Sequence, residues 1–307
     1  LMKVSTSQIF ERATTQMAQQ QSKVAAMQTQ LATGKQVLRP SDSPEQAGMI
    51  QRLSSALNRQ DVYSSNLDAI NSRLGAEEAA LMSSEDVMQR VRELAVQASS
   101  DTMSDADRKI IASEVTALRD QLLSLANAQD VSGNYVFSGS MVRDQPFTED
   151  AEGNLVYQGD QNRMLVDVSD QRQLALNRPG NEVFSSVIRE TDGVSERVGF
   201  FQVIDDFNAA LLNQDSGQLQ NSLAEVSELT LNMAFSIADV GSRLRISELQ
   251  TDSLADAKLR YQTLLSGAED LDYATAITQL TSEIMSLEAG QSSFAKISQL
   301  TLFDYIR

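Results

Sequence analysis

The sequence contains neither cysteine nor histidine in its 307 residues. Their absence excludes thiol nucleophiles, disulfides and histidine general bases, and it removes nearly every kind of zinc site. An enzyme built from this chain would have only carboxylate, serine, lysine or tyrosine side chains for its chemistry. The missing cysteines also fit a protein that works outside the cell without disulfides, although many cytosolic proteins lack cysteine too.

Positive charge is scarce: 25 lysines and arginines stand against 42 aspartates and glutamates, for a formal net charge of −17. A nucleic-acid duplex or an anionic membrane surface would repel this charge, so we expect no nucleic-acid and no membrane partner. Long hydrophobic runs are absent as well, because no apolar stretch approaches the roughly 18 residues that a membrane span needs. Residues 1–16 contain one lysine and no hydrophobic stretch, so we expect no Sec signal peptide there.

Acidic residues occur in clusters, namely Glu77-Glu78, Asp205-Asp206 and Glu269-Asp270-Asp272. None of these clusters has the ligand spacing and the glycine of a calcium-binding EF-hand loop. We therefore interpret them as solvated helix faces, and we expect no metal, no cofactor and no catalytic residue. The alternative is a secreted enzyme with its site in residues 131–199, built from aspartate, glutamate, serine, tyrosine or arginine groups.

Glycine and proline are few, and they gather in one part of the chain. Seven of the 14 glycines and two of the four prolines lie between Gly133 and Gly199. Short apolar or alternating runs recur there between turn signals, in "NYVFSG", "NLVYQGD", "RMLVDVSD" and "QLALNRPG". The stretch Glu152-Gly153-Asn154 has the residues of a hairpin turn. These features predict a small β domain inserted into a different kind of structure.

Both ends of the chain have helical periodicity. Hydrophobic positions recur at steps of seven near one end and at alternating steps of four and three near the other. These seams are too narrow to form a globular core alone, so each needs a partner, either within the chain or in another subunit. The predicted seam residues are Phe10, Met17, Val24 and Leu31, and then Tyr273, Ile277, Leu280, Ile284, Leu287 and Phe294.

Long helices are also predicted between the ends and the β domain. One begins at Pro44 and runs for about 55 residues, and a second follows Ser104, whose hydroxyl can cap it. Helical stretches return at residues 200–212 and 219–265. The predicted fold is mainly α with a β insertion, a nested bundle of long helices with a terminal coiled coil and a β domain at the tip. Its predicted domains are 1–43 with 266–307, 44–132 with 200–265, and 133–199.

The segment "VMQRVRELAVQASS", residues 87–100, contains charges and small apolar residues on one helix. At ~100° per residue, Arg90, Glu93 and Gln97 share one flank, Arg92 projects from the opposite flank, and Val96 faces outward. A solvated, salt-bridged face explains the charges but not the exposed valine. The face predicted to be buried consists of Val87, Met88, Val91, Leu94, Ala95 and Ala98.

This segment begins a longer match. "QRVRELAVQASSDTMSDADRKIIASEVTALRDQLLSLANAQ" resembles a helical block of the bacterial flagellins. "LATGKQVLRPSDSPEQAGMIQRLSSAL" resembles the stretch that joins the terminal and inner domains of that family, and "DVGSRLRISELQ" resembles its C-terminal inner helix. The resemblance to the flagellin family covers both helical flanks and leaves out the β insertion.

Within the family, the chain is more similar to the proteins of the hook–filament junction than to filament flagellins. "RPSDSPEQA" resembles their Pro-Ser-Asp-x-Pro link, where flagellins usually have Ala-Lys-Asp-Asp-Ala-Ala-Gly. The stretches "MKVSTSQIF" and "LTLFDYIR" and the short insertion are also similar to junction proteins. The alternative is a minor flagellin that polymerises in the filament itself.

The resemblance implies a structural axial protein of the flagellum, not an enzyme. Its terminal helices would pair as a coiled coil in a tubular assembly, and its inner helices would contact neighbouring subunits through Arg90, Arg92, Glu93, Val96 and Gln97. The implied partners are further copies of the chain, hook-associated protein 1, flagellin, an export chaperone and the flagellar type III export apparatus. The implied location is outside the cell at the hook–filament junction, reached without a cleaved signal peptide.

Overall fold

The computed structural model describes residues 2–100, 103–151, 153–191 and 194–305. The chain divides into two compact units, Leu1–Arg59 with Asp256–Arg307, and Gln60–Ala255. Two long helices contribute residues to both units. These are α2 (Pro44–Ala98), with 55 residues, and α6 (Ser216–Glu269), with 54 residues.

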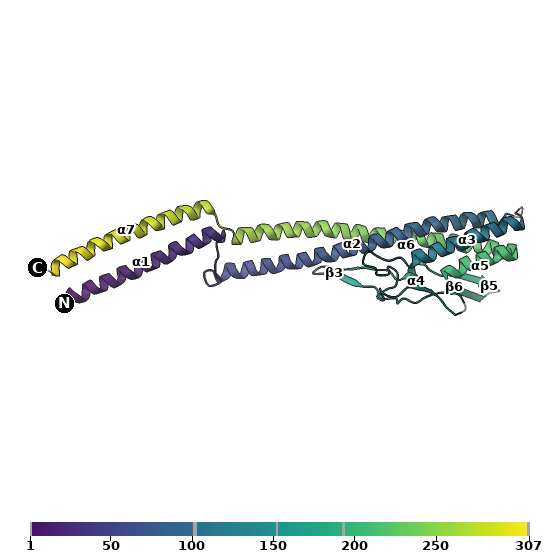
Figure 1. Cartoon of the computed structure of the whole chain (residues 1–307), viewed down its shortest axis with the longest axis horizontal. Coiled ribbons are helices and arrows are strands. Elements are labelled where there is room, and N and C mark those ends of the chain that lie inside the picture. Colours follow the sequence, from purple (N-terminus) through teal and green to yellow (C-terminus); the bar gives the residue numbers. More distant parts are fainter. Residues whose placement is uncertain (1, 101–102, 152, 192–193, 306–307) are drawn as a thin grey trace. The chain divides into compact units, whose positions relative to one another are not determined.

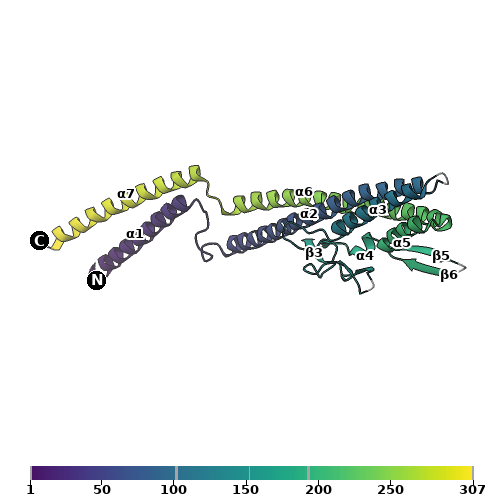
Figure 2. The same ribbon diagram turned by 45° about the vertical axis from the view of Figure 1, so that its right-hand side comes forward.

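The first unit contains the terminal helices α1 (Met2–Thr33) and α7 (Tyr273–Tyr305), which lie side by side in antiparallel directions (Figures 1 and 2). Along α1, half-buried side chains recur at steps of three and four, and none of its described side chains is fully buried. One narrow stripe therefore meets the other helix while the remaining sides face solvent. The half-buried residues of α1 include Phe10, Ala13, Met17, Gln20, Val24, Met27 and Leu31.

Backbone hydrogen bonds hold the base of this terminal pair. Gly34 follows α1 in the left-handed conformation, with a φ of 70°, which favours glycine. Its carbonyl accepts a hydrogen bond from the Leu271 N–H at 2.9 Å, and the Gln36 N–H donates to the Glu269 carbonyl at 2.8 Å. The Lys35 ammonium forms a salt bridge with the Glu269 carboxylate. These contacts join the end of α1 to the segment just before α7.

The second unit is a helical bundle of α2 and α6 with α3 (Asp105–Ala126) and α5 (Phe200–Asn213). Ser104 caps α3 as predicted, because its hydroxyl accepts the Asp107 N–H at 3.3 Å. Ile110 of α3 is 67% exposed although it is a large apolar residue. Burying a large apolar side chain stabilises a fold by roughly 1.5–3 kcal/mol. The fully buried side chains include Leu67, Leu74, Leu81, Met88, Leu122, Ile204, Phe207 and Leu219.

Between α3 and α5 the chain forms three separate antiparallel hairpins. They pair β1 (Phe147–Glu149) with β2 (Leu155–Tyr157), β3 (Leu165–Ser169) with β4 (Arg172–Ala175), and β5 (Val187–Thr191) with β6 (Val194–Val198). The one-turn helix α4 (Gly180–Val183) precedes β5.

The predicted turn of the first hairpin lies between β1 and β2. Gly153 has a φ of 85° and donates its N–H to the Asp150 carbonyl at 3.1 Å, while the Asp150 N–H donates to the Asn154 carbonyl at 2.9 Å. Glu152, the first residue of the predicted turn, lies outside the described residues.

Aromatic rings attach the hairpins to the bundle. Phe184 packs edge-on against Phe200 with ring centroids 5.2 Å apart, and Phe147 packs against Phe201 at 5.4 Å. Figure 1 shows β5 and β6 beside α5. The prediction of a mainly α fold with a β insertion is confirmed. The three-domain division stays a prediction, although all six strands lie within residues 133–199.

No helix in the described ranges has the length and apolar character required to cross a membrane.

Candidate assembly surfaces

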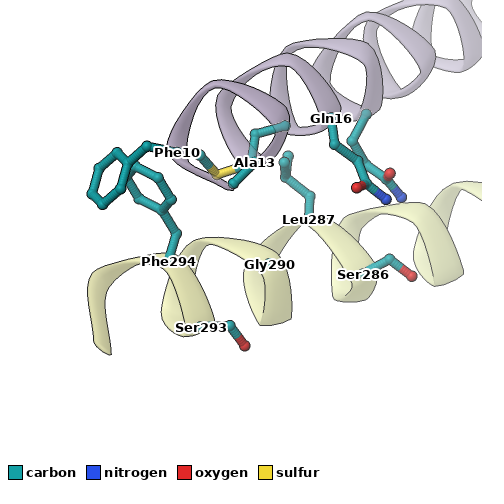
Figure 3. Close-up of a pocket in the computed structure, with 10 residues that line it drawn as sticks. Phe10, Ala13, Gln16, Ser286, Leu287, Gly290, Ser293 and Phe294 are labelled. Atoms are coloured by element: carbon teal, nitrogen blue, oxygen red, sulfur yellow. The ribbon is translucent and has the colours of Figure 1, made fainter. Parts of the chain in front are cut away.

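The seam between α1 and α7 encloses a cavity of about 250 Å³. Phe10 and Phe294 close one end of it, edge to face, with ring centroids 4.7 Å apart (Figure 3). Met17 and Leu287 line the cavity too, but the residues opposite one another include the small Ala13 and Gly290. Because small residues leave space that large ones would fill, this part of the seam is loosely packed.

The ten predicted seam residues divide into two groups. The first group is half-buried and lies along the seam. Tyr273 and Ile277 form the second group, and they are 52% and 54% exposed. At this end of α7 the buried position is Ala276. The half-buried group consists of Phe10, Met17, Val24, Leu31, Leu280, Ile284, Leu287 and Phe294.

A polar layer interrupts the seam, and the hydrophobic pattern did not predict it. The Gln20 amide donates a hydrogen bond to a carboxylate oxygen of Glu283 at 2.6 Å, and both side chains are half-buried. A buried polar pair in a coiled coil specifies register at the expense of stability. The one sequence signal was that Gln20 occupies a seam position that is otherwise hydrophobic.

A second surface of α7 faces away from α1. Ile277 and Met285 are 54% and 64% exposed there. They line a shallow groove of about 590 Å³ together with Thr278, Thr281 and Ser282. No charged side chain lines this groove. An uncharged, partly apolar helix face is what another helix would cover.

In the second unit, residues 87–98 of α2 have the buried face that the periodicity predicts. Val87, Met88, Val91, Leu94, Ala95 and Ala98 are each at most 5% exposed. The opposite side of this helix carries the five residues predicted as inner subunit contacts. All five are exposed, namely Arg90, Arg92, Glu93, Val96 and Gln97.

Arg90 forms ion pairs within the single chain, although its side chain is exposed. Its Nε lies 2.7 Å from a carboxylate oxygen of Glu114 on α3, and its Nη1 lies 3.0 Å from Glu93. Hydrogen bonds with Glu114 and Glu93 raise the pKa of Arg90. The Glu93 pair follows from spacing along the helix, but the Glu114 pair requires α3 to fold back beside α2.

Val96 is 57% exposed, as predicted, and it lines a groove of about 470 Å³ between α2 and α6. Arg92, Glu93 and Gln89 line the same groove from α2, and Thr230 lines it from α6. Exposed apolar side chains also occur elsewhere on α6, where Leu231 is 55% exposed and Phe235 is 64% exposed. The sequence analysis did not predict this exposed face, although the four-residue spacing of the two side chains indicates that they share it.

The acidic clusters are mainly ion-pair anchors, not solvated faces. Asp205 holds Arg119 at 2.7 Å, and Asp206 holds Arg189 of the β5–β6 hairpin, also at 2.7 Å. Glu77 departs furthest from the prediction because it is 0% exposed. It pairs with Arg243, which is 166 positions away in sequence. Within the described residues, no group of three acidic side chains could hold a metal ion.

The chain is similar to known flagellar proteins. The model of the bacterial flagellin N-terminal helical region matches residues 4–141. Flagellar hook-associated protein 3 of Salmonella typhimurium is 27% identical over 322 residues, covering 100% of both chains. Flagellar hook-associated protein 3 of Escherichia coli K12 is 29% identical and covers 98% of this chain and 99% of its own.

The chain resembles the bacterial flagellins over its N-terminal part and flagellar hook-associated protein 3 over its whole length.

A solved structure supports this resemblance. The crystal structure of Xanthomonas campestris FlgL is 25% identical, with a TM-score of 0.61, and covers 71% of this chain and 99% of its own. The predicted resemblance to the hook-associated branch of the flagellins is therefore confirmed. The alternative of a minor flagellin is less supported, because the full-length relatives above are hook-associated proteins. The assignment of particular residues to subunit contacts stays a prediction.

Proposed function

We propose that this chain is a structural, non-enzymatic axial protein of the flagellum that joins hook-associated protein 1 to the flagellin filament. The observation that carries the proposal is the match over essentially the whole length of flagellar hook-associated protein 3 from two bacteria. The chain's own chemistry is consistent with it. Its described surface offers apolar side chains and paired charges, and it lacks histidine and cysteine for catalysis.

Copies of the chain would form a layer of a tube through heterologous contacts, in which one surface meets a different surface of the next copy. The groove on α7 around Ile277 and Met285 is one such surface. The α2–α6 groove with Val96 is another, on a different unit, and the exposed Phe235 of α6 is a further candidate contact. One end of the layer would contact hook-associated protein 1 and the other end flagellin.

We also propose that the chain acts outside the cell and is exported by the flagellar type III route, with the help of an export chaperone. The terminal helices support this, because their narrow and loosely packed seam stabilises a single chain weakly. Segments that order only on assembly are suited to passage through a channel and to chaperone binding before it.

Deletion of the gene tests the proposed junction function. We expect the cells to keep their hooks, to lose their filaments and to release unpolymerised flagellin into the medium. A plasmid copy of the gene should restore filaments, and a flagellin gene at the same locus should not. Normal filaments on the deletion strain would contradict the proposal, and shortened filaments alone would favour a minor flagellin.

A further inference from the structure

A chain of alternating charges runs from the interior of the helical bundle to the β insertion. Buried Glu77 of α2 pairs with Arg243 of α6, whose Nε also lies 3.0 Å from Asp239 one turn away. Asp239 is next approached by Arg178 of the insertion, with 3.6 Å between Oδ2 and Nη1. Arg178 continues the series to Glu182 of α4, at 3.4 Å. Three segments distant in sequence are thus joined by five charges.

Glu77 is the least accessible charge of the series, and the two outer carboxylates are the most accessible. The Glu77 side chain is 1% exposed, those of Arg243 and Arg178 are 16% and 20% exposed, and those of Asp239 and Glu182 are 51% and 35% exposed. Water therefore weakens the outer pairs, while the inner pair acts in a poorly hydrated environment where electrostatic interactions are strong. The buried end is thus the part of the series where one charge has the largest effect.

Two buried polar atoms of this series lack a hydrogen-bond partner among the described residues. Glu77 Oε2 and Arg178 Nη1 are buried and have no hydrogen-bond partner. Arg243 divides its guanidinium between Glu77 and Asp239, and Asp239 divides its carboxylate between Arg243 and Arg178. A change in one ion pair therefore changes how the charged group of the next pair is shared between its two partners.

The remaining charged group beside Glu77 has its own partners. Arg73 lies one turn earlier on α2 and is 5% exposed. Its Nη1 is 3.1 Å from Asp130, and its Nη2 donates to the Tyr135 carbonyl at 2.8 Å. Because these contacts do not involve Glu77, neutralising Glu77 leaves Arg73 in place.

We propose that ionised Glu77 seats the β3–β4–α4 part of the insertion on the bundle. By holding Nη2 of Arg243, it limits Arg243 to a single contact with Asp239, through Nε, and leaves the Asp239 carboxylate shared with Arg178. When Glu77 is neutral, Arg243 turns fully to Asp239 and displaces Arg178. The insertion then opens locally while α2 and α6 remain packed through their apolar faces. Glu77 is in this sense a positioning residue for a segment that it does not touch.

Hydrogen exchange on the full chain tests the proposal, with Glu77→Gln as the variant and Glu78→Gln as the matched control. The reporters are backbone amides bonded within or to the insertion, those of Leu176, Gly180 and Phe184. We expect Glu77→Gln to speed their exchange about tenfold at neutral pH, within the range of coupling between interacting groups. Glu78→Gln should leave their exchange unchanged.

A double-mutant cycle separates coupling from general destabilisation. Arg178→Gln should speed the same amides, and adding Glu77→Gln to it should produce no further increase, because the connection is already broken. Additive effects would overturn the proposal. So would an equal increase in the amides of α2 and α6, which reports global unfolding, or no change in the insertion at all.

Discussion

At the scale of single residues, the least expected feature is a carboxylate buried in a helical bundle. Burial raises the pKa of Glu77 above its ordinary value of 4.5, and its attraction to Arg243 only partly offsets this. Buried ion pairs contribute little to stability, and sometimes reduce it, compared with apolar residues of similar size. Glu77 is therefore better explained by what it positions than by what it stabilises.

The pH dependence of stability follows from this shift. Because the folded chain holds the Glu77 proton more tightly than the unfolded chain, the residue favours folding below pH 4.5 and loses this contribution as pH rises through its folded-state pKa. Glutamine does not titrate. The unfolding free energy of the wild type minus that of Glu77→Gln should therefore fall as the pH rises above 4.5. Urea unfolding at several pH values measures it, and a difference that grows with pH would contradict the shift.

The exposed side chain of Phe235 gives a second prediction at this scale. Phe235→Ala should change the unfolding free energy of the single chain by no more than about 0.5 kcal/mol, since surface substitutions rarely do more. It should weaken assembly strongly, because buried aromatic side chains dominate many interfaces. Filament retention in a complemented deletion strain measures the effect. Leu212→Ala is the control, because Leu212 is similarly exposed, at 53%, but belongs to α5 and not to α6. Equal retention by the two variants would exclude Phe235 from the interface.

At the scale of elements, periodicity and capping predicted the helices well. Pro44 begins α2 and Ser104 caps α3, because both signals act locally. Tyr273 and Ile277 are exposed although the heptad pattern places them in the seam. A straight helix drifts by about 20° per heptad from a 3.5-residue repeat, so the pattern loses the seam toward one end of the helix. Contacts between distant segments had no signal in the sequence. The Glu77–Arg243 and Arg90–Glu114 pairs depend on which helices become neighbours.

The loose packing of α7 gives a prediction at the scale of the element. An added Cβ at Gly290 would meet nothing within 4 Å, so Gly290→Ala fits without strain. It should stabilise α7 by roughly 0.5–1 kcal/mol, because glycine loses more backbone entropy on folding than alanine. Slower protease cleavage within residues 273–305 would show it. Gly267→Ala is the control, since Gly267 of α6 is equally unobstructed but lies outside α7. Equal protection by both variants would argue against a local effect.

At the scale of the whole molecule, this chain lacks a concentrated chemical site in its described residues. Its exposed apolar side chains are instead distributed over α2, α6 and α7 in both units. That distribution suits a protein that contacts several neighbours at once. The sequence predicted only part of it. Exposure at Val96 followed from periodicity within one helix, but the α2–α6 groove needed two helices from opposite ends of the chain.

The two units should also differ in how far they depend on assembly. The described α1 side chains are at best half-buried, while the second unit contains a continuous core from Leu67 to Leu254. Segments with few buried apolar contacts open most readily. Light proteolysis of the purified monomer should therefore remove roughly residues 1–40 and 270–307 and leave a stable fragment, whose ends mass spectrometry identifies. The same termini should resist cleavage in isolated hook–filament junctions. Termini that resist cleavage already in the monomer would show that their order does not depend on assembly.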